Sequence, residues 1–319
     1  MTEKLAQFID LLVDNKELPA SNWLAELSDL DQAGIEFLGE HWENIPPEKR
    51  KLLLEALGQL ADDDYMLSFG SINRFAIMDT EADVRRLAVR NLWESEDYHL
   101  IPTLISILLN DLFPEVRAAA AKALGPFVLY GESDNYPRQF LLDVENALLN
   151  SLHGENDKLV QCRCIESLGY SSREEVDQLI LDAYNSADED LVQSALMAMG
   201  RSADVRWTEY IFSNLHSQSP ALRYEAAVAA GELELRDSIP ELIELLDDVD
   251  PRIRRAATWS ISQIGGSSAT EALSSLMENA ENDEKDLLDL QDALDYLDFT
   301  NSIRDLVPRN GINEQDHPS

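Results

Sequence analysis

A ten-residue pattern of apolar and small residues recurs along this chain, and its clearest copy occupies residues 116–125. Further copies occupy residues 84–93, 160–169, 191–200, 222–231 and 253–262. At roughly 100° per residue, the first, fifth, eighth and ninth positions of the pattern share one side of a helix. The first position always holds a branched apolar residue, and the fifth holds alanine or cysteine. The pattern therefore predicts a buried helix at each copy, with small residues that let a neighbouring helix approach closely.

The copies are evenly spaced in the second half of the chain. Their last residues, Gly169, Gly200, Gly231 and Ser262, lie 31 residues apart. Another amphipathic segment precedes each copy, as at residues 239–246. A fixed period of this length is typical of helical repeats, whose core grows along one axis. We therefore predict an all-α fold, an α-solenoid of about eight helix–turn–helix units.

The two ends of the chain and one internal stretch depart from the repeat. Residues 1–45 keep helical spacing without the pattern, and we expect them to form an N-terminal helical cap. The predicted solenoid covers residues 46–298. Within it, residues 126–138 are predicted to be a loop insertion, because Gly131, Asp134-Asn135 and Pro137 are loop signals. Residues 299–319 are expected to form a C-terminal tail that is disordered at its polar end.

One repeat carries a resemblance to a known family. The sequence IPELIELLDDV at residues 239–249 and DPRIRRAATWSISQIG at residues 250–265 resemble the HEAT-like repeats first named from phycobilisome lyases. Residues 220–248 match nearly as well, and the resemblance extends over residues 45–298. As a whole, the chain resembles bacterial HEAT-repeat proteins. Such repeats serve as scaffolds, adaptors and, less often, enzymes, so the resemblance implies a fold rather than a reaction.

The charge of the chain narrows the range of partners. Asp and Glu number 61 against 25 Lys and Arg, which gives a net charge of −36. This field repels phosphate backbones and anionic membranes, so we expect neither nucleic acid nor membrane as a partner. The acidic residues serve solubility in one interpretation and attract a basic protein partner in another. The chain opens without a secretory leader pattern and lacks a long apolar run, so we expect a cytoplasmic protein, which we take to be a monomer.

The residues that carry most enzyme chemistry are scattered. Cys162 and Cys164 are two residues apart and therefore point to different sides of one helix. None of the five histidines is followed by glutamate, so the sequence lacks the His-Glu pairs with which HEAT-repeat deoxyhypusine hydroxylases hold two irons. We find no metal-ligand spacing, no glycine-rich phosphate loop and no Ser/His/Asp set. The sequence therefore predicts a non-enzymatic protein with no metal and no cofactor.

The exposed side of the second helix in each unit is the best candidate for a binding surface. Positions three, seven and ten of the pattern lie opposite the buried side, and the second helices of a solenoid are expected to line its concave face. We predict that the partner contacts the following residues: Arg86, Arg90, Trp93, Met197, Tyr224, Val228, Arg255 and Trp259. Tryptophan, tyrosine and arginine dominate interface energetics. In the alternative interpretation, the apolar members only fill gaps between neighbouring helices.

A second row, at position two of the pattern, is rich in arginine: Arg50, Arg85, Arg117, Arg223 and Arg254. An anionic partner is one candidate ligand for this row. We favour a structural role, in which the arginines pair with acidic residues just ahead of the pattern, namely Asp83, Asp157 and Asp250.

The sequence thus predicts a non-enzymatic scaffold or adaptor that binds a protein or peptide on the concave face of a solenoid. The alternative is a bilin lyase-like protein or another chaperone of chromophore proteins, which the type of repeat alone suggests. Nucleic-acid binding is a third interpretation, and the net charge of −36 opposes it.

Overall fold

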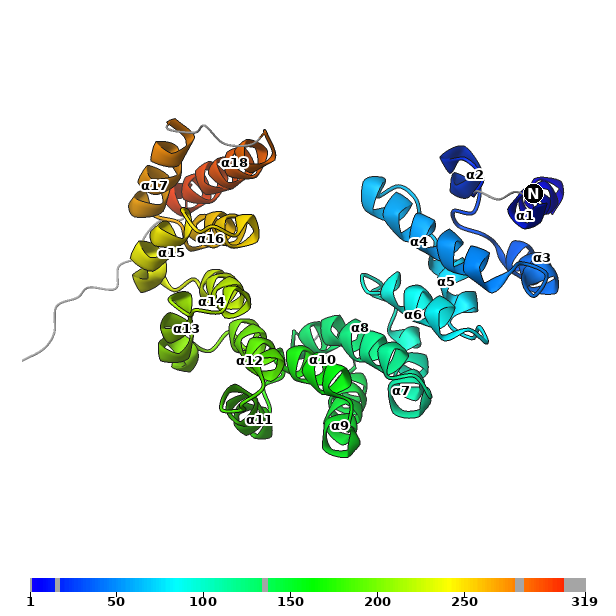
Figure 1. The fold of residues 1–319 in the computed structure, drawn as a ribbon, viewed down its shortest axis with the longest axis horizontal. Coiled ribbons are helices and arrows are strands. Elements are labelled where there is room, and N and C mark those ends of the chain that lie inside the picture. Colours follow the sequence, from blue (N-terminus) through cyan, green and yellow to red (C-terminus); the bar gives the residue numbers. More distant parts are fainter. Residues whose placement is uncertain (1, 15–17, 134–136, 279–283, 307–319) are drawn as a thin grey trace, which may run out of the picture. The chain divides into compact units, whose positions relative to one another are not determined.

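All regular structure among the described residues of the computed structural model is helical, which confirms the all-α prediction (Figure 1). The structure describes residues 2–14, 18–133, 137–278 and 284–306. The chain forms two compact units, Met1–Val176 and Asp177–Ser319, which we call the N-terminal and C-terminal units. Their boundary falls within helix α11 (Glu174–Tyr184). Each unit is a stack of helical repeats of the α-solenoid type, so the core is divided between two bodies.

The N-terminal unit begins with three helices, α1 (Thr2–Asp14), α2 (Ser21–Ala25) and α3 (Gln32–Trp42). Helix α1 packs on α3, α2 packs on α4, and α3 packs on α5, so the segment predicted as a cap is helical and covers the first repeats. The repeat helices of this unit are α4 (Pro47–Asp63), α5 (Gly70–Ala76), α6 (Ala82–Arg90), α7 (Ile101–Asn110), α8 (Pro114–Glu132), α9 (Arg138–Gly154) and α10 (Lys158–Leu168).

The C-terminal unit continues the same alternation of first and second helices. After α11, its helices are α12 (Glu189–Arg201), α13 (Thr208–Leu215), α14 (Pro220–Glu232), α15 (Ile239–Leu245), α16 (Pro251–Ile264), α17 (Ser267–Glu278) and α18 (Glu284–Leu306). Asp188, Ser219 and Asp250 each accept a backbone hydrogen bond at the start of a second helix. These side chains satisfy amides that a helix leaves unpaired in its first turn.

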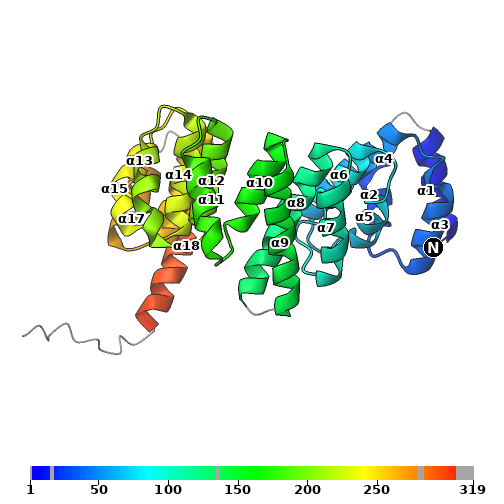
Figure 2. The same ribbon diagram turned by 90° about the horizontal axis from the view of Figure 1, so that it is seen from below.

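The helices of each unit form two layers (Figures 1 and 2). In the N-terminal unit, the second helices α4, α6, α8 and α10 pack side by side, and the first helices form the other layer. In the C-terminal unit, the second helices α12, α14, α16 and α18 pack in the same way. The ten-residue pattern lies on these second helices, so their mutual packing explains why the pattern is so regular.

The small residues at the fifth position lie in the core, where neighbouring second helices approach one another closely. Ala88, Ala120, Ala195, Ala226 and Ala257 are all fully buried, as is the cysteine that replaces alanine in α10. Their small side chains let neighbouring second helices approach closely. The prediction of a small-residue column at this position is therefore confirmed.

The eighth position adds a hydrogen bond that the pattern of residue sizes does not reveal. Ser260 Oγ donates to the carbonyl oxygen of Ala227 at 2.7 Å, and Ser167 Oγ donates to that of Ala121 at 2.9 Å. Each acceptor is the sixth residue of the ten-residue pattern in the preceding second helix. A buried hydroxyl needs such a partner, so serine at this position fixes the register between two repeats.

The arginines at position two tie successive repeats together. Arg85 Nε lies 2.8 Å from a carboxylate oxygen of Asp111, in the turn of the next helical pair. Arg85 Nη1 donates to the carbonyl oxygen of Asp79, in the turn of its own pair, at 2.8 Å. Equivalent contacts join Arg117 to Glu155 and the Asp111 carbonyl, and Arg223 to Asp248 and the Ser217 carbonyl. We call this series of contacts the arginine ladder.

The ladder supports the structural role predicted for these arginines, but the predicted partners are wrong. Asp157 and Asp250 cap the helices that follow them, and Asp83 contacts Lys51 and Arg86. The acids that pair with the ladder arginines lie in the turn of the following repeat. An arginine side chain is long enough to reach that turn, and no local spacing in the sequence indicates that it does.

The pKa values of the ladder carboxylates make the stability of the unit depend on pH. Burial raises the pKa of Asp111, but hydrogen bonds from Arg85 and from the Phe113 amide lower it overall. A carboxylate whose folded pKa lies below its unfolded value stabilises the fold above that unfolded value. The stabilisation disappears as the pH falls through the folded pKa.

We therefore expect Arg85→Met to destabilise the protein more at about pH 7 than at about pH 3, because the contribution of the contact with Asp111 declines as the pH falls towards the lowered pKa of that carboxyl. Urea denaturation at both pH values measures the difference. Lys4→Met is the control, because Lys4 forms an ion pair with Glu26 on an exposed surface and should contribute little at either pH. An equal loss for Arg85→Met at both pH values would show that its contact with Asp111 does not stabilise the fold.

The predicted loop at residues 126–138 is wrong for its first half. Helix α8 continues through Pro126 to Glu132. Phe127 and Val128 are buried in this extension, and Gly131 lies close to Leu141 of α9. Burial of two large apolar side chains outweighs the helix-breaking tendency of proline here. Residues 134–136 lie outside the described residues.

The predicted C-terminal tail is also shorter than expected. Helix α18 continues to Leu306, so residues 299–306 are helical, and Leu297 just before them is buried. The expected disorder concerns residues 307–319, which lie outside the described residues.

Candidate binding grooves

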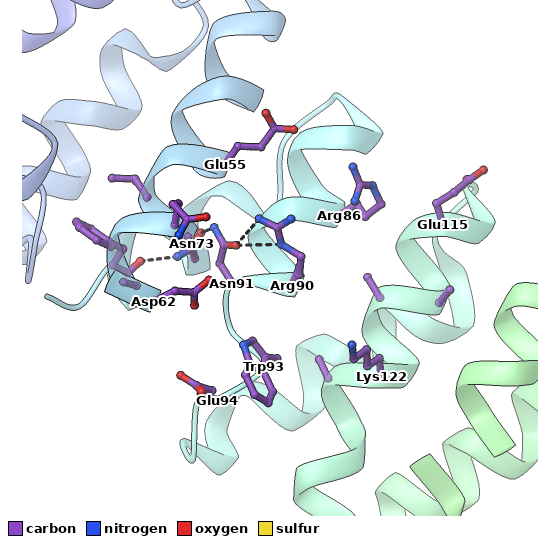
Figure 3. A pocket seen from close by; sticks show the side chains of 18 of the residues that line it. Glu55, Asp62, Asn73, Arg86, Arg90, Asn91, Trp93, Glu94, Glu115 and Lys122 are labelled. Atoms are coloured by element: carbon purple, nitrogen blue, oxygen red, sulfur yellow. Dashed lines mark hydrogen bonds between the residues drawn. The ribbon is translucent and has the colours of Figure 1, made fainter. Parts of the chain in front are cut away.

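A groove of about 770 Å³ lies on the second helices of the N-terminal unit (Figure 3). Three predicted residues, Arg86, Arg90 and Trp93, come together in it from α6 and the turn after it. Lys122 of α8 lines the same groove. Trp93 keeps 47% of its surface exposed, so its indole is available to a partner. We call this the N-terminal groove.

The charges of the N-terminal groove are mixed. Glu55, Asp62, Glu94 and Glu115 line it together with the three cations named above (Figure 3). Arg86 lies 3.3 Å from Asp83, at the limit of a hydrogen bond. Attraction and repulsion therefore balance along this groove, and its electrostatics do not favour one sign of partner.

Asn91 organises the floor of the N-terminal groove, and sequence reasoning missed it. Its Nδ2 donates to the carbonyl oxygen of Leu54 at 2.8 Å. Its Oδ1 accepts from Arg90 Nη2 at 3.2 Å (Figure 3). Asn91 occupies the eighth position of the pattern, where the other copies have alanine or serine. An amide side chain at a position that otherwise holds alanine or serine is the signal in the sequence that could have indicated this role. Its contacts hold the Arg90 guanidinium beside the groove.

A second groove, of about 720 Å³, lies on α12, α14 and α16 of the C-terminal unit. The structure brings four predicted residues together in it: Tyr224, Val228, Arg255 and Trp259. Trp259 is 41% exposed, whereas Tyr224 and Val228 are half-buried. We call this the C-terminal groove.

The predicted residue Met197 does not line the C-terminal groove. It lies on α12 and is half-buried, as the alternative interpretation of a gap-filling side chain expects. The tenth position also differs from the prediction, because Gly125, Gly200 and Gly231 face the next second helix at this position. Trp93 is exposed because it lies beyond Arg90, the last residue of the short helix α6.

Two polar residues of the C-terminal groove, Arg252 and Glu232, were missed in the sequence. Arg252 precedes the ten-residue pattern by one residue and Glu232 follows it by one. Because Tyr224, Val228 and Glu232 are four residues apart, they share one side of α14. A search that extended this side beyond the pattern would have found Glu232.

Most charges of the C-terminal groove are compensated within the protein. Arg252 forms an ion pair with Asp250 at 2.7 Å, and this contact lowers the pKa of Asp250 to about 2. Arg255 lies 3.7 Å from Asp289. Glu232 differs, because desolvation by the protein near its carboxylate raises its pKa to about 7, against the opposing effect of Arg201, although the residue as a whole is exposed.

The two cysteines lie inside the helical stack. Both are buried, and burial raises the pKa of Cys164 to about 12. A thiol with this pKa is protonated at neutral pH and is a poor nucleophile. Within the described residues, no three His, Cys, Asp or Glu side chains are arranged to hold a metal ion.

One family model matches the sequence of these repeats. Residues 74–141 and 208–289 match the model of HEAT repeats. These two segments of the chain are HEAT repeats. They include Arg86, Arg90 and Trp93 of the N-terminal groove as well as Tyr224 and Trp259 of the C-terminal groove.

Three solved structures that are similar to this chain are proteins of different kinds. The CpcE and CpcF complex of phycocyanin lyase from Nostoc sp. PCC7120 is 17% identical with a TM-score of 0.48, over 72% of this chain and 94% of that one. Human deoxyhypusine hydroxylase is 17% identical with a TM-score of 0.36, over 93% and 97%. A designed armadillo repeat protein in complex with the peptide (KR)4 is 18% identical with a TM-score of 0.37, over 62% and 99%. Likenesses of this degree assign neither an activity nor a partner to this chain.

No curated protein sequence matches the chain. Among the described residues, no helix is both long and apolar enough to cross a membrane.

Proposed function

We propose that this protein is a non-enzymatic scaffold that binds a protein or peptide in its C-terminal groove. The observation that carries the proposal is the apolar surface of Tyr224, Val228 and Trp259, which lies between polar residues on adjacent second helices. Exposed aromatic side chains that line a groove and have a polar rim are typical of protein interfaces.

The N-terminal groove gives this scaffold a second contact surface. Trp93 is the aromatic anchor there, and Arg86, Arg90 and Lys122 surround it (Figure 3). Two grooves on one chain suit a scaffold, because linked sites raise the apparent affinity for a partner that reaches both. The N-terminal groove is the place to test next if the C-terminal groove fails.

Capture of partners from native lysate tests the proposal. The intact protein is compared with the double variant Tyr224→Ala, Trp259→Ala, after circular dichroism has shown that the variant is folded. The matched control is Val205→Ala, Val249→Ala, which removes two exposed apolar side chains outside the groove. We expect a partner that the intact protein and the control retain and that the groove variant loses.

Equal retention by all three proteins would contradict binding in the C-terminal groove. Equal loss from the groove variant and the control would show a nonspecific effect of removing surface apolar area. The buried aromatic anchors of an interface typically contribute on the order of 2 kcal/mol or more each, so the expected loss is well above the scatter of such an experiment.

A further inference from the structure

The C-terminal groove ends in a carboxylate without a partner. Glu232 is the last residue of α14 and lines the groove beyond Val228. Among the described residues, its carboxylate makes neither an ion pair nor a hydrogen bond. The other two charged residues of this groove, Arg252 and Arg255, each lie close to an aspartate, so Glu232 marks one end of the groove as locally negative.

The position of the Glu232 carboxylate is set by Gly200 of α12. A Cβ atom added to Gly200 would lie 2.3 Å from Glu232 Oε2, so the carboxylate rests directly on the helix backbone there. The residue as a whole is exposed in the groove, so a partner can reach its carboxylate. An accessible carboxylate that makes no ion pair attracts an arriving cation.

The ends of three helices add to the negative potential at this place. The late residues of the second helices pack on one another, since Gly200 of α12 faces Ala229 of α14, and Gly231 of α14 faces Ser260 of α16. The three helices therefore run parallel, and their C-terminal ends gather on the Glu232 side. Helix C-termini carry partial negative charge and favour cations.

The other charged groups near Glu232 are engaged elsewhere or lie at the far end. Arg252 and Arg255 lie near the start of α16, and each is close to an aspartate of its own unit. Arg201 of α12 is the cation whose charge acts on Glu232. Glu225, on the same helix as Glu232, is buried and accepts a hydrogen bond from Gln193. The groove thus has an end at which arginines pair with aspartates, an aromatic middle and an acidic end at Glu232.

We infer that the C-terminal groove takes a peptide segment that places a lysine or arginine side chain at Glu232 and an apolar side chain against Trp259 and Val228. The inference rests on the proposed function and specifies the chemistry of the partner. Coulombic attraction at Glu232 and apolar burial at Trp259 then select a basic residue beside an aliphatic or aromatic one. A single acid at a defined distance along the groove also fixes the direction of the peptide.

A random-peptide phage library is the probe for this inference. It is selected separately against the intact protein and the variants Glu232→Gln, Trp259→Ala and Glu244→Gln. Glu244 is an exposed acid on α15, outside the groove, and its variant controls for the loss of one negative charge. We expect the intact protein and Glu244→Gln to enrich peptides with a basic residue close to an apolar one. Glu232→Gln should lose the basic preference alone, and Trp259→Ala the apolar preference.

A synthetic peptide from the first selection, containing lysine or arginine but no histidine, gives the second readout. We expect it to bind Glu232→Gln about tenfold more weakly than the intact protein. Its affinity for the intact protein should fall between about pH 8 and about pH 6, because Glu232 becomes protonated and loses its charge. The charged groups that face Glu232 are Arg201, Glu225, Arg252 and Arg255, and all four are present in Glu232→Gln as well. Binding to Glu232→Gln should therefore not change with pH.

The outcomes separate the inference from the proposed function. Enrichment of apolar peptides without a basic residue would overturn the inference and leave binding in the groove intact. Enrichment of acidic peptides, or equal basic enrichment by Glu232→Gln, would also overturn it. If the intact protein enriches no sequence, both the inference and the proposed function fail for peptides.

Discussion

Replacing Arg50 with methionine is expected to lower the free energy of unfolding by about 3–5 kcal/mol. Arg50 Nη1 lies 2.5 Å from a carboxylate oxygen of Asp79, and both side chains are buried. Trp42 Nε1 donates to the same oxygen at 2.5 Å. Without the guanidinium, the Asp79 carboxylate keeps its neutral donors but loses the only cation that forms a described ion pair with it. The uncompensated buried charge causes the loss of stability.

Two controls show whether the buried charge is the cause. The double variant Arg50→Met, Asp79→Leu replaces both partners with apolar side chains, and we expect it to recover much of the lost stability. Lys4→Met breaks the exposed pair with Glu26 and should change stability by less than about 1 kcal/mol. Urea denaturation measures all three. If the double variant is no more stable than Arg50→Met, another contact of Arg50 carries the effect.

Gly231→Ala is expected to destabilise the C-terminal unit by about 1–3 kcal/mol, because the new methyl group overpacks the contact between α14 and α16. A Cβ atom at this position would lie 2.8 Å from the Cα atom of Ser260 and 2.7 Å from its Oγ. Backbone cannot move away as the end of a long side chain can. The same hydroxyl donates to Ala227, so the substitution also disturbs a buried hydrogen bond.

Gly154→Ala is the matched control for this variant. Gly154 also lies at the end of a helix, and an added Cβ would have no atom within 4 Å. It should leave stability unchanged or raise it by about 0.4–1 kcal/mol through the unfolded chain. Thermal and urea denaturation compare the two variants. Equal behaviour would mean that the tenth-position glycines are not required by close packing of the second helices.

The repeat architecture was predictable because each second helix packs against its neighbours in the same way. Branched residues at the first position and alanine at the fifth therefore recur with a period that can be recognised in the sequence alone. The ladder partners were not predictable in this way, because Arg85 and Asp111 lie 26 residues apart and meet only through the stacking of repeats. The continuation of helix α8 through Pro126 was likewise not predictable, since it depends on burial of Phe127 and Val128.

Part of the candidate site followed from the same reasoning. Tyr224, Val228 and Trp259 lie opposite the buried side of their helices, and the structure places them in one groove. Glu232 was missed because the ten-residue pattern ends one residue before it. Its carboxylate lies against Gly200, a residue of the preceding repeat. The sequence of one repeat therefore does not show the contact between Glu232 and the neighbouring repeat.

The arginine ladder has a consequence for how such a chain grows by duplication. Each ladder arginine and its acid lie in successive helical pairs, as Arg85 and Asp111 do. A tandem duplicate of a helical pair such as α7 and α8 carries both a turn acid and an arginine, so the arginine of the first copy would meet the acid of the second. The ladder would then continue across the new junction. It therefore tolerates the gain of whole helical pairs, whereas the gain of a single helix would interrupt it.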